Sequence, residues 1–175
     1  MNLDKLIIRN AIISDIPEVV KLHVDSWNKT YKGIIAQDYL DNMKNNIDKR
    51  IERMKNEFNL RKMIVATIDK EIVAYSEYTL TNVFSKDLDI DCELCGLYVK
   101  NECVGTGIGT RIFNYVMSEF IKNDNSKMGL WCVKENTNAI SFYKSKGGIQ
   151  VSEKKFELAG KEYSEIAFVY DLSDK

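Results

Sequence analysis

The alternation of apolar and polar positions along the chain predicts strands and helices in a definite order. Apolar residues at every second position indicate strands, and apolar residues three or four positions apart indicate helices. Strands are predicted over residues 6–9, 63–68, 72–80, 88–99 and 127–133, followed by a hairpin of 149–158 and 163–172. Helices are predicted over 15–29, 37–59, 106–122 and 137–146. This order indicates a single domain over residues 1–175, with one mixed α/β sheet and helices packed on it.

The junction between the predicted strand 88–99 and the predicted helix 106–122 carries the most informative motif. The strand ends with Leu97-Tyr98-Val99, and Val104-Gly105-Thr106-Gly107-Ile108-Gly109 follows. Glycines at such a junction let the backbone approach a ligand, and the helix N-terminus carries a partial positive charge. A phosphate or pyrophosphate is therefore the expected ligand. By itself, this spacing also fits a turn that only packs a helix tightly on a strand.

Two common phosphate sites do not match this motif. A P-loop would end in Gly-Lys-Ser/Thr, which the turn lacks. A dinucleotide-binding Rossmann site would place its glycines in the first βαβ unit, with an acid about 20 residues further on. Here the turn lies past the middle of the chain, and Asp124 falls in a polar loop.

Composition and charge exclude several other classes of protein. The 175 residues are 45% hydrophobic and 29% charged, and the net charge of −1 gives no basic field for nucleic acid. No apolar run reaches the ~20 residues that a membrane helix needs, and residues 1–5 do not read as a signal peptide. We expect a cytoplasmic protein that binds neither nucleic acid nor membrane.

The four cysteines are expected to be reduced thiols without a metal. Cys92 and Cys95 form a Cys-x-x-Cys, but residues three apart in a strand point to opposite faces. There is no second cysteine pair, and His23 is the single histidine of the sequence.

From about Leu6 to Leu172 the chain resembles the GNAT superfamily of acetyl-CoA-dependent N-acetyltransferases. The first family motif is matched by Glu93-Leu94-Cys95-Gly96-Leu97-Tyr98-Val99 and the glycine turn that follows it. The second is matched by Leu130-Trp131-Cys132-Val133-Lys134-Glu135-Asn136, then Ala139, Phe142, Tyr143 and Gly147. The resemblance implies a central mixed, mostly antiparallel sheet, flanked by helices, whose fourth and fifth strands splay apart beside a bulge at Cys95-Gly96.

Three positions depart from the family pattern. Val104 stands where the family usually has Gln or Arg, Asn101 where a proline is common, and Gly148 where an aromatic residue often follows Gly147. Because backbone N–H groups largely hold the cofactor, Val104 need not abolish binding, but it removes a polar partner near the pyrophosphate.

The resemblance also implies the donor, acetyl-CoA, with CoA as product. Leu97 and Val99 would contact the pantetheine arm through their backbone, the turn would cradle the pyrophosphate, and Asn136 would hydrogen-bond the arm from its other side. The expected cofactor-binding residues are Leu97, Tyr98, Val99, Val104, Gly105, Thr106, Gly107, Ile108, Gly109, Thr110, Asn136, Phe142 and Tyr143.

Direct attack of an amine on the thioester, in a ternary complex, requires a base and gains from an acid near the sulfur. Tyr143 occupies the position of the family's acid, although without the resemblance it would be read as a packed aromatic beside Phe142. Glu93 is the candidate base and a candidate acceptor-binding residue.

Acidic residues alternate with apolar ones before the glycine turn. If this run is extended, its acids share one face that would attract a cationic amine and raise the proton affinity of Glu93. The alternative is a solvated outer face of the strand. The acids are Asp87, Asp89, Asp91 and Glu93, and the apolar residues are Leu88, Ile90, Cys92 and Leu94.

Trp27 and Tyr31 lie one helical turn apart and are the expected acceptor-binding aromatics. Residues 26–31 resemble the early helix of small-molecule members such as polyamine acetyltransferases. An aromatic pair could stack on a cation, although plain core packing also suits Trp27. His23, one turn earlier, is expected to be a packed histidine.

The function expected from these residues is acetyl-CoA-dependent N-acetylation of a small-molecule primary amine, polyamine-like or otherwise. One alternative is a protein N-terminal or lysine acetyltransferase. Another is an acyl-CoA-binding sensor without turnover, which Val104 keeps open and which Tyr143, Asn136 and Glu93 oppose. The last hairpin could supply an edge for a homodimer, but nothing in the sequence requires one.

Overall fold

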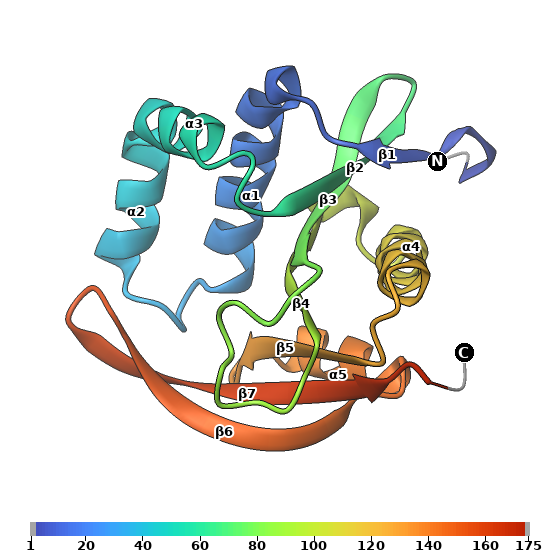
Figure 1. Cartoon of the computed structure of the whole chain (residues 1–175). Coiled ribbons are helices and arrows are strands. Elements are labelled where there is room, and N and C mark those ends of the chain that lie inside the picture. Colours follow the sequence, from blue (N-terminus) through green and yellow to red (C-terminus); the bar gives the residue numbers. More distant parts are fainter. Residues whose placement is uncertain (1–2, 174–175) are drawn as a thin grey trace. The chain divides into compact units, whose positions relative to one another are not determined.

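The structure is a computed structural model that describes residues 3–173. The chain divides into two compact units (Figure 1). Unit 1 comprises Met1–Tyr78 and Gly96–Ser118, and unit 2 comprises Thr79–Cys95 and Glu119–Lys175. Strand β4 (Cys92–Val99) and helix α4 (Ile108–Lys122) each run from one unit into the other. The expectation of a single domain stays a prediction.

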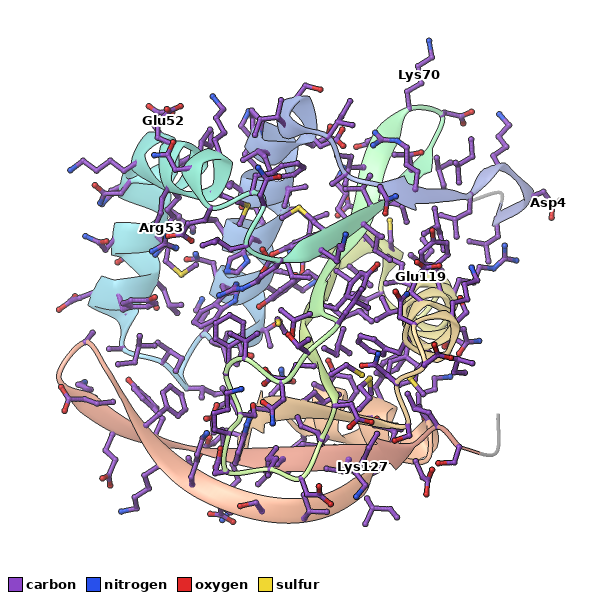
Figure 2. All side chains as sticks on the ribbon, in the orientation of Figure 1. Asp4, Glu52, Arg53, Lys70, Glu119 and Lys127 are labelled. Carbon is purple, nitrogen blue, oxygen red and sulfur yellow. The ribbon has the colours of Figure 1, made fainter. Side chains whose placement is uncertain are left out.

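The strands of unit 1 are β1 (Ile7–Asn10), β2 (Lys62–Ile68) and β3 (Glu71–Thr79), with the second half of β4. β1 and β3 each pair antiparallel with β2. Asp69 and Lys70 join β2 to β3 with φ angles of 49° and 74°, as a tight two-residue hairpin turn requires. Lys70 projects outward from this turn (Figure 2).

The second half of β4 lies next to β3. Lys100 N donates to Val73 O at 2.8 Å, and Ser76 Oγ donates to Gly96 O at 2.7 Å. These contacts fix which residues of β3 and β4 share a face, and the candidate site is built on that face.

Three helices of unit 1 lie together on one side of its strands, and the first part of α4 lies on the other side (Figure 1). They are α1 (Ile16–Thr30), α2 (Gln37–Asn45) and α3 (Ile47–Asn56). α1 begins where predicted: Pro17 stands in its first turn, and the Asp15 carboxylate accepts hydrogen bonds from Ile12 N at 2.8 Å and Arg9 Nη1 at 2.7 Å. The Arg9 guanidinium holds the pKa of Asp15 below its usual range.

The prediction of one helix over 37–59 is wrong, because the chain breaks at Asn46. Its φ of −122° and ψ of 33° leave the helical region. Its side-chain amide donates to Asn42 O at 3.0 Å, and asparagine side chains compete in this way with backbone hydrogen bonds. Short 3₁₀ turns complete unit 1 at Leu3–Lys5, Ile13–Asp15 and Asn101–Cys103.

Unit 2 contains the first half of β4, β5 (Lys127–Val133), α5 (Thr137–Ser145), β6 (Ile149–Leu158) and β7 (Lys161–Asp171). β4 and β5 are parallel at Cys92↔Met128 and Glu93↔Gly129, and this ladder does not extend to Leu94 or Cys95. β7 pairs antiparallel with both β5 and β6. The early end of the ladder fits the expected splay of the fourth and fifth strands.

The predicted start of the fourth strand at residue 88 is wrong, because β4 begins at Cys92 and residues 80–91 form a loop. The Asn82 side chain donates to Ser85 O at 2.9 Å and Leu88 O at 3.1 Å, and it accepts from Ser85 N at 3.1 Å. Such side-chain bonds to the backbone favour turns over strands. Leu88 and Ile90 are buried against Ala167 of β7.

Within residues 3–173, seven strands occur in the order β1-β2-β3-β4-β5-β7-β6, and their registers define four antiparallel pairings and one parallel pairing. The expected mixed, mostly antiparallel α/β fold is confirmed. Among residues 3–173, no helix has the length and apolar character needed to cross a lipid bilayer.

Candidate active site

The glycine turn of unit 1, residues 104–109, opens helix α4 with an exposed backbone. Gly105 and Gly107 have φ angles of 83° and 91°, and a Cβ at either position would have no heavy atom within 4 Å. The first backbone hydrogen bond of the helix runs from Arg111 N to Gly107 O at 3.1 Å. Within the described chain, the N–H groups before it lack an acceptor; they belong to Gly105, Gly107, Ile108, Gly109 and Thr110.

This turn fits a bound pyrophosphate. Several adjacent N–H donors and the positive end of the α4 dipole together favour an anion with many acceptor oxygens. Thr106 Oγ1 donates to Cys103 O at 2.6 Å, which fixes the approach to the turn. Val104 is 67% exposed and adds no polar group there. Asn101, in place of a proline, donates its amide to Asp25 O at 3.4 Å.

Unit 1 also gathers a group of aromatic rings, here termed the aromatic face. Trp27 and Tyr31 have ring centroids 4.7 Å apart, so the two predicted acceptor-binding residues do lie together. Trp27 Nε1 donates to Tyr98 Oη at 3.3 Å, and Tyr98 stacks on Tyr75 with centroids 5.0 Å apart. The rings of the aromatic face belong to His23, Trp27, Tyr31, Tyr75 and Tyr98.

His23 is packed into the aromatic face as a neutral ring. Burial, with the nearby charges of Arg50 and Arg53, lowers its pKa to about 3, so the imidazole carries no charge at neutral pH. Its Nδ1 is hydrogen-bonded to the Tyr75 hydroxyl, whose own pKa is raised by complete burial. These properties suit a positioning role and not that of a base at neutral pH.

Two residues near this face were not singled out in the sequence. Tyr75 and Glu77 alternate along β3 and therefore point to the same side of the strand as each other. The sequence does carry a sign of this pair: the strand Ala74-Tyr75-Ser76-Glu77-Tyr78 contains an acid, Glu77, two residues after Tyr75. An acid inside a buried strand marks a site that requires a charge or a proton acceptor.

In unit 2, Asn136 precedes helix α5, and Tyr143 lies in its last turn. Asn136 is the N-cap, and its Oδ1 accepts from Ala139 N at 3.1 Å. Tyr143 is 8% exposed, and its ring contacts Phe142 and Phe168 with centroids 5.4 Å and 6.1 Å away. Their predicted contacts with the donor stay predictions.

Gly148 departs from the family pattern for a structural reason. A Cβ at this position would lie 2.6 Å from Tyr170 Oη and 3.0 Å from Tyr143 O. The Tyr170 hydroxyl donates to Tyr143 O at 2.9 Å, which ties α5 to β7. The phenol of Tyr170 therefore occupies the space beside Gly148, and the position affects packing.

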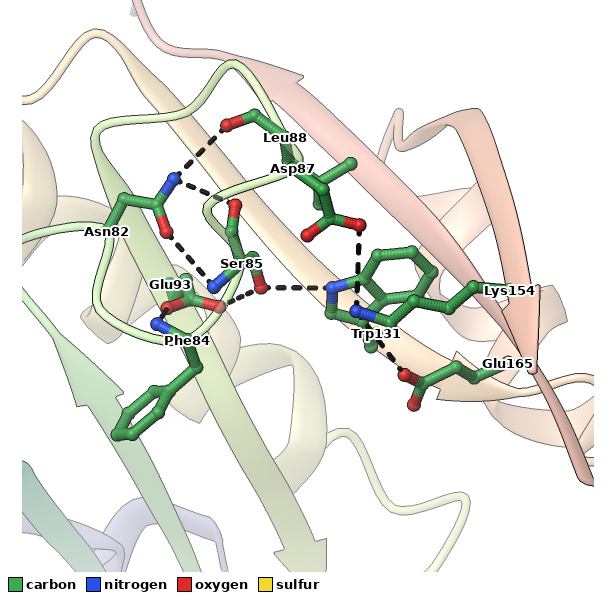
Figure 3. Close-up of polar contacts among 9 residues, drawn as sticks. All are labelled: Asn82, Phe84, Ser85, Asp87, Leu88, Glu93, Trp131, Lys154 and Glu165. Carbon is green, nitrogen blue, oxygen red and sulfur yellow. Dashed lines mark hydrogen bonds and ion pairs between the residues drawn. The ribbon is translucent and has the colours of Figure 1, made fainter. Parts of the chain in front are cut away.

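Glu93 is buried in unit 2 and holds the loop of residues 80–91 (Figure 3). One carboxylate oxygen accepts from Val83 N at 3.2 Å and Phe84 N at 2.8 Å, and the other accepts from Ser85 Oγ. Trp131 Nε1 in turn donates to Ser85 Oγ at 2.9 Å. Both oxygens of Glu93 are thus engaged by donors of the protein itself.

The prediction of an acidic row on one face of a strand is wrong, because its members lie in a loop and have separate partners. Asp91 Oδ2 accepts from Ser126 N and Lys127 N, both at 2.9 Å, which holds the pKa of Asp91 below its usual range. Asp89 pairs with Lys127, at the start of β5 (Figure 2), at 2.6 Å. Asp87 lies 3.7 Å from Lys154, whose ammonium stands over the Trp131 ring (Figure 3).

All four cysteines are free thiols. Burial raises the pKa of Cys132 to about 12 and also raises the pKa of Cys92, so neither is a thiolate at neutral pH. Within residues 3–173, no three His, Cys, Asp or Glu side chains are grouped so that they could hold a metal ion.

Comparison with known proteins identifies the class. The description of the family model that matches residues 18–147 is Acetyltransferase (GNAT) family. Because this match spans most of the 175 residues, the chain belongs to the GNAT acetyltransferase family, and its class is that of N-acetyltransferases, a group of acyltransferases. The resemblance inferred from the two motifs is confirmed.

Individual relatives agree with this assignment. The chain is 29% identical over 167 residues to the uncharacterized N-acetyltransferase YuaI of Bacillus subtilis, covering 95% of this chain and 94% of YuaI. It resembles the structure of PaiA N-acetyltransferase from Thermoplasma acidophilum in complex with coenzyme A, with a TM-score of 0.69, 18% identity, and coverage of 94% and 99%.

It also resembles the structure of YncA, a putative acetyltransferase from Salmonella typhimurium with its cofactor acetyl-CoA. That TM-score is 0.68 with 14% identity, and the match covers 98% of this chain and 96% of YncA. At such low identity, the two solved structures show a shared fold.

The Glu93 network predicts that Glu93→Gln destabilises the fold. The substitution replaces one acceptor oxygen with an amide donor facing N–H or O–H groups, so the free energy of unfolding should fall by about 1–3 kcal/mol. Urea denaturation measures this change. Asp89→Asn is the control, because that side chain is 97% exposed and little change is expected. An E93Q variant as stable as the wild type would contradict the network's structural role.

Proposed function

We propose that this protein transfers an acetyl group from acetyl-CoA to the primary amine of a small cationic molecule. The observation that carries the proposal is the glycine turn, whose adjacent N–H groups stand without acceptors at the start of α4. Acetyl-CoA, when bound, supplies the acetyl group as a thioester that a neutral amine can attack directly. CoA is then the second product.

The roles of the donor-binding residues follow from their positions. The N–H groups of Gly105 and of residues 107–110 hold the pyrophosphate, and the α4 dipole supports its charge. The backbone of Leu97 and Val99 hydrogen-bonds the pantetheine arm. The family match, together with the coenzyme A of the PaiA structure and the acetyl-CoA of the YncA structure, supports acetyl-CoA as the donor.

The aromatic face supports a cationic acceptor. Ring faces attract ammonium groups, and indole does so most strongly. Trp27, Tyr31 and Tyr98 are the half-buried members of this face that we assign to the acceptor. A compact ammonium held against these rings loses water and is oriented for attack.

Tyr143 acts as the acid. Its Oη gives a proton to the departing sulfur, so CoA leaves as the thiol. The attacking nitrogen loses a proton as the amide forms, and the Tyr143 phenolate regains one. Phe142 and Phe168 hold the ring in place by their contacts.

The experiment that tests the proposed function measures acetyl-CoA-dependent thiol release with polyamines, amino acids, aminoglycosides and short peptides. We expect release with a cationic small amine, and we expect Tyr143→Phe to lower kcat by about 10²-fold or more, because general acid catalysis contributes this much. The variant keeps the ring and removes the hydroxyl. Acetyl-CoA binding, followed by calorimetry, should be unchanged.

Other outcomes would contradict the proposal in different ways. Release with peptides alone would assign a protein acceptor. Acetyl-CoA binding without release for any acceptor would favour a binding protein that has lost its chemistry, a reading that the apolar Val104 would then support.

The glycine turn predicts a second result. Gly107→Ala places a side chain at a φ of 91°, and the strain of ~1–2 kcal/mol should distort the turn and weaken acetyl-CoA binding about tenfold. Gly33→Ala is a matched control, since Gly33 has a φ of 79° and open space around it but lies outside the motif. Calorimetry with both variants separates a loss of acetyl-CoA affinity caused by the turn from one caused by general backbone strain. An equal loss of affinity in both variants would argue against the turn as the donor site.

A further inference from the structure

Glu77 is a carboxylate placed in the interior of β3, in the part of the strand that contacts β4. Ser76, its neighbour, donates to Gly96 O at 2.7 Å, and Tyr75, two residues back, stacks on Tyr98. The Glu77 side chain is only 13% exposed. It therefore belongs to the same side of β3 as Tyr75, next to the stretch of β4 that carries Tyr98.

Gly96 determines where the Tyr98 ring lies. A Cβ on Gly96 would stand 2.7 Å from Tyr98 Cε2, so the ring covers the place where a side chain would otherwise be. The ring thus turns back along β4 toward the Ser76–Gly96 contact, and the Tyr98 and Glu77 side chains interact electrostatically. An aromatic face and a carboxylate in one place are the two groups that bind an ammonium ion.

The charges around Glu77 leave it able to take a proton. Arg61 Nη1 lies 3.4 Å from Glu77 Oε2, at the outer limit for a hydrogen bond, and the Arg61 side chain is 38% exposed. Glu57, which follows the last residue of α3, adds a negative charge, and Arg53 of α3, labelled in Figure 2, adds a positive one. Burial outweighs the two positive charges and raises the pKa of Glu77 above its usual value.

Glu93, the carboxylate expected from the sequence, has the opposite surroundings. Its oxygens accept from Val83 N, Phe84 N and Ser85 Oγ, so a proton placed on either oxygen would displace a donor of the protein. Glu77 has the weak contact to Arg61 instead. Of the two buried glutamates, Glu77 is therefore the one whose oxygens accept fewer hydrogen bonds from the protein itself.

We propose that Glu77 is the general base, which takes a proton from the acceptor's ammonium group while the aromatic face holds that group. The proton passes from the acceptor nitrogen to a carboxylate oxygen of Glu77, and the electron pair stays on the nitrogen. The neutral amine is then competent to attack, and Glu77 returns the proton to water. This inference rests on the proposed N-acetyltransferase function, and it identifies the residue that deprotonates the acceptor.

The first test replaces Glu77 with glutamine and follows kcat/KM against pH, using an amine that the wild type accepts. The Glu77→Gln variant should lose about 10²–10⁴-fold in kcat and lose the acid limb of the profile, because the group that must be deprotonated is gone. Acetyl-CoA binding by calorimetry should be unchanged. Glu71→Gln is the matched control: Glu71 is a glutamate at the start of the same strand, and its side chain is 57% exposed.

The second test is independent of whether E77Q folds. Arg61→Gln removes the positive charge that lowers the pKa of Glu77, so that pKa rises and the acid limb should move to higher pH. Lys62→Gln removes an equal charge from the next, exposed residue and should leave the limb in place. A Glu77 with a purely structural role would not move the limb in either variant.

The outcomes separate this inference from the proposed function. If E77Q and R61Q both turn over as fast as the wild type, with the acid limb of the pH profile unchanged, Glu77 is not the base. The proposed transferase function is unaffected by that result. A fall in E77Q activity that keeps the wild-type pH profile also overturns it, because binding and not proton transfer would be lost. A wild type that binds acetyl-CoA and acetylates no amine overturns both proposals.

Discussion

Strand β4 pairs in parallel with β5 at Cys92 and Glu93, and the candidate site depends on where this pairing ends. The parallel ladder with β5 stops after Glu93↔Gly129, while the residues from Gly96 onward lie beside β3. The glycine turn and α4 follow directly. One strand therefore carries a structural half, anchored through Glu93, and a half to which we assign the contacts with the ligands.

The two buried glutamates illustrate how burial alone does not assign chemistry. Glu93 satisfies two backbone N–H groups and a serine hydroxyl, so its charge stabilises a loop. Glu77 has one long contact to Arg61 and interacts electrostatically with Tyr98, and we propose that it exchanges a proton with the acceptor. The two glutamates differ in how many hydrogen bonds they accept from the protein. This number is our reason for assigning Glu93 a structural role and Glu77 the role of base.

Much of the fold could be predicted because its elements bury one side at a regular period. β5 occupies the predicted residues 127–133, and the glycine turn opens α4 as the motif implies. The loop of residues 80–91 was misread because Leu88 and Ile90 pack on β7 while the intervening acids find lysine and backbone partners, which reproduces the alternation of a strand. Glu77 was missed because its meaning depends on Tyr98, which is distant in sequence and brought close by the pairing of β3 with β4.

The account rests on the claim that the glycine turn and the aromatic face of unit 1 bind the two substrates. A crystal structure with CoA and an accepted amine tests this most directly. We predict pyrophosphate oxygens within hydrogen-bond distance of the N–H groups of Gly105 and of residues 107–110, and the amine nitrogen between the Trp27–Tyr98 rings and the Glu77 carboxylate. A pyrophosphate bound away from the turn, or an amine nitrogen bound to Glu93 in place of Val83, Phe84 and Ser85, would contradict it.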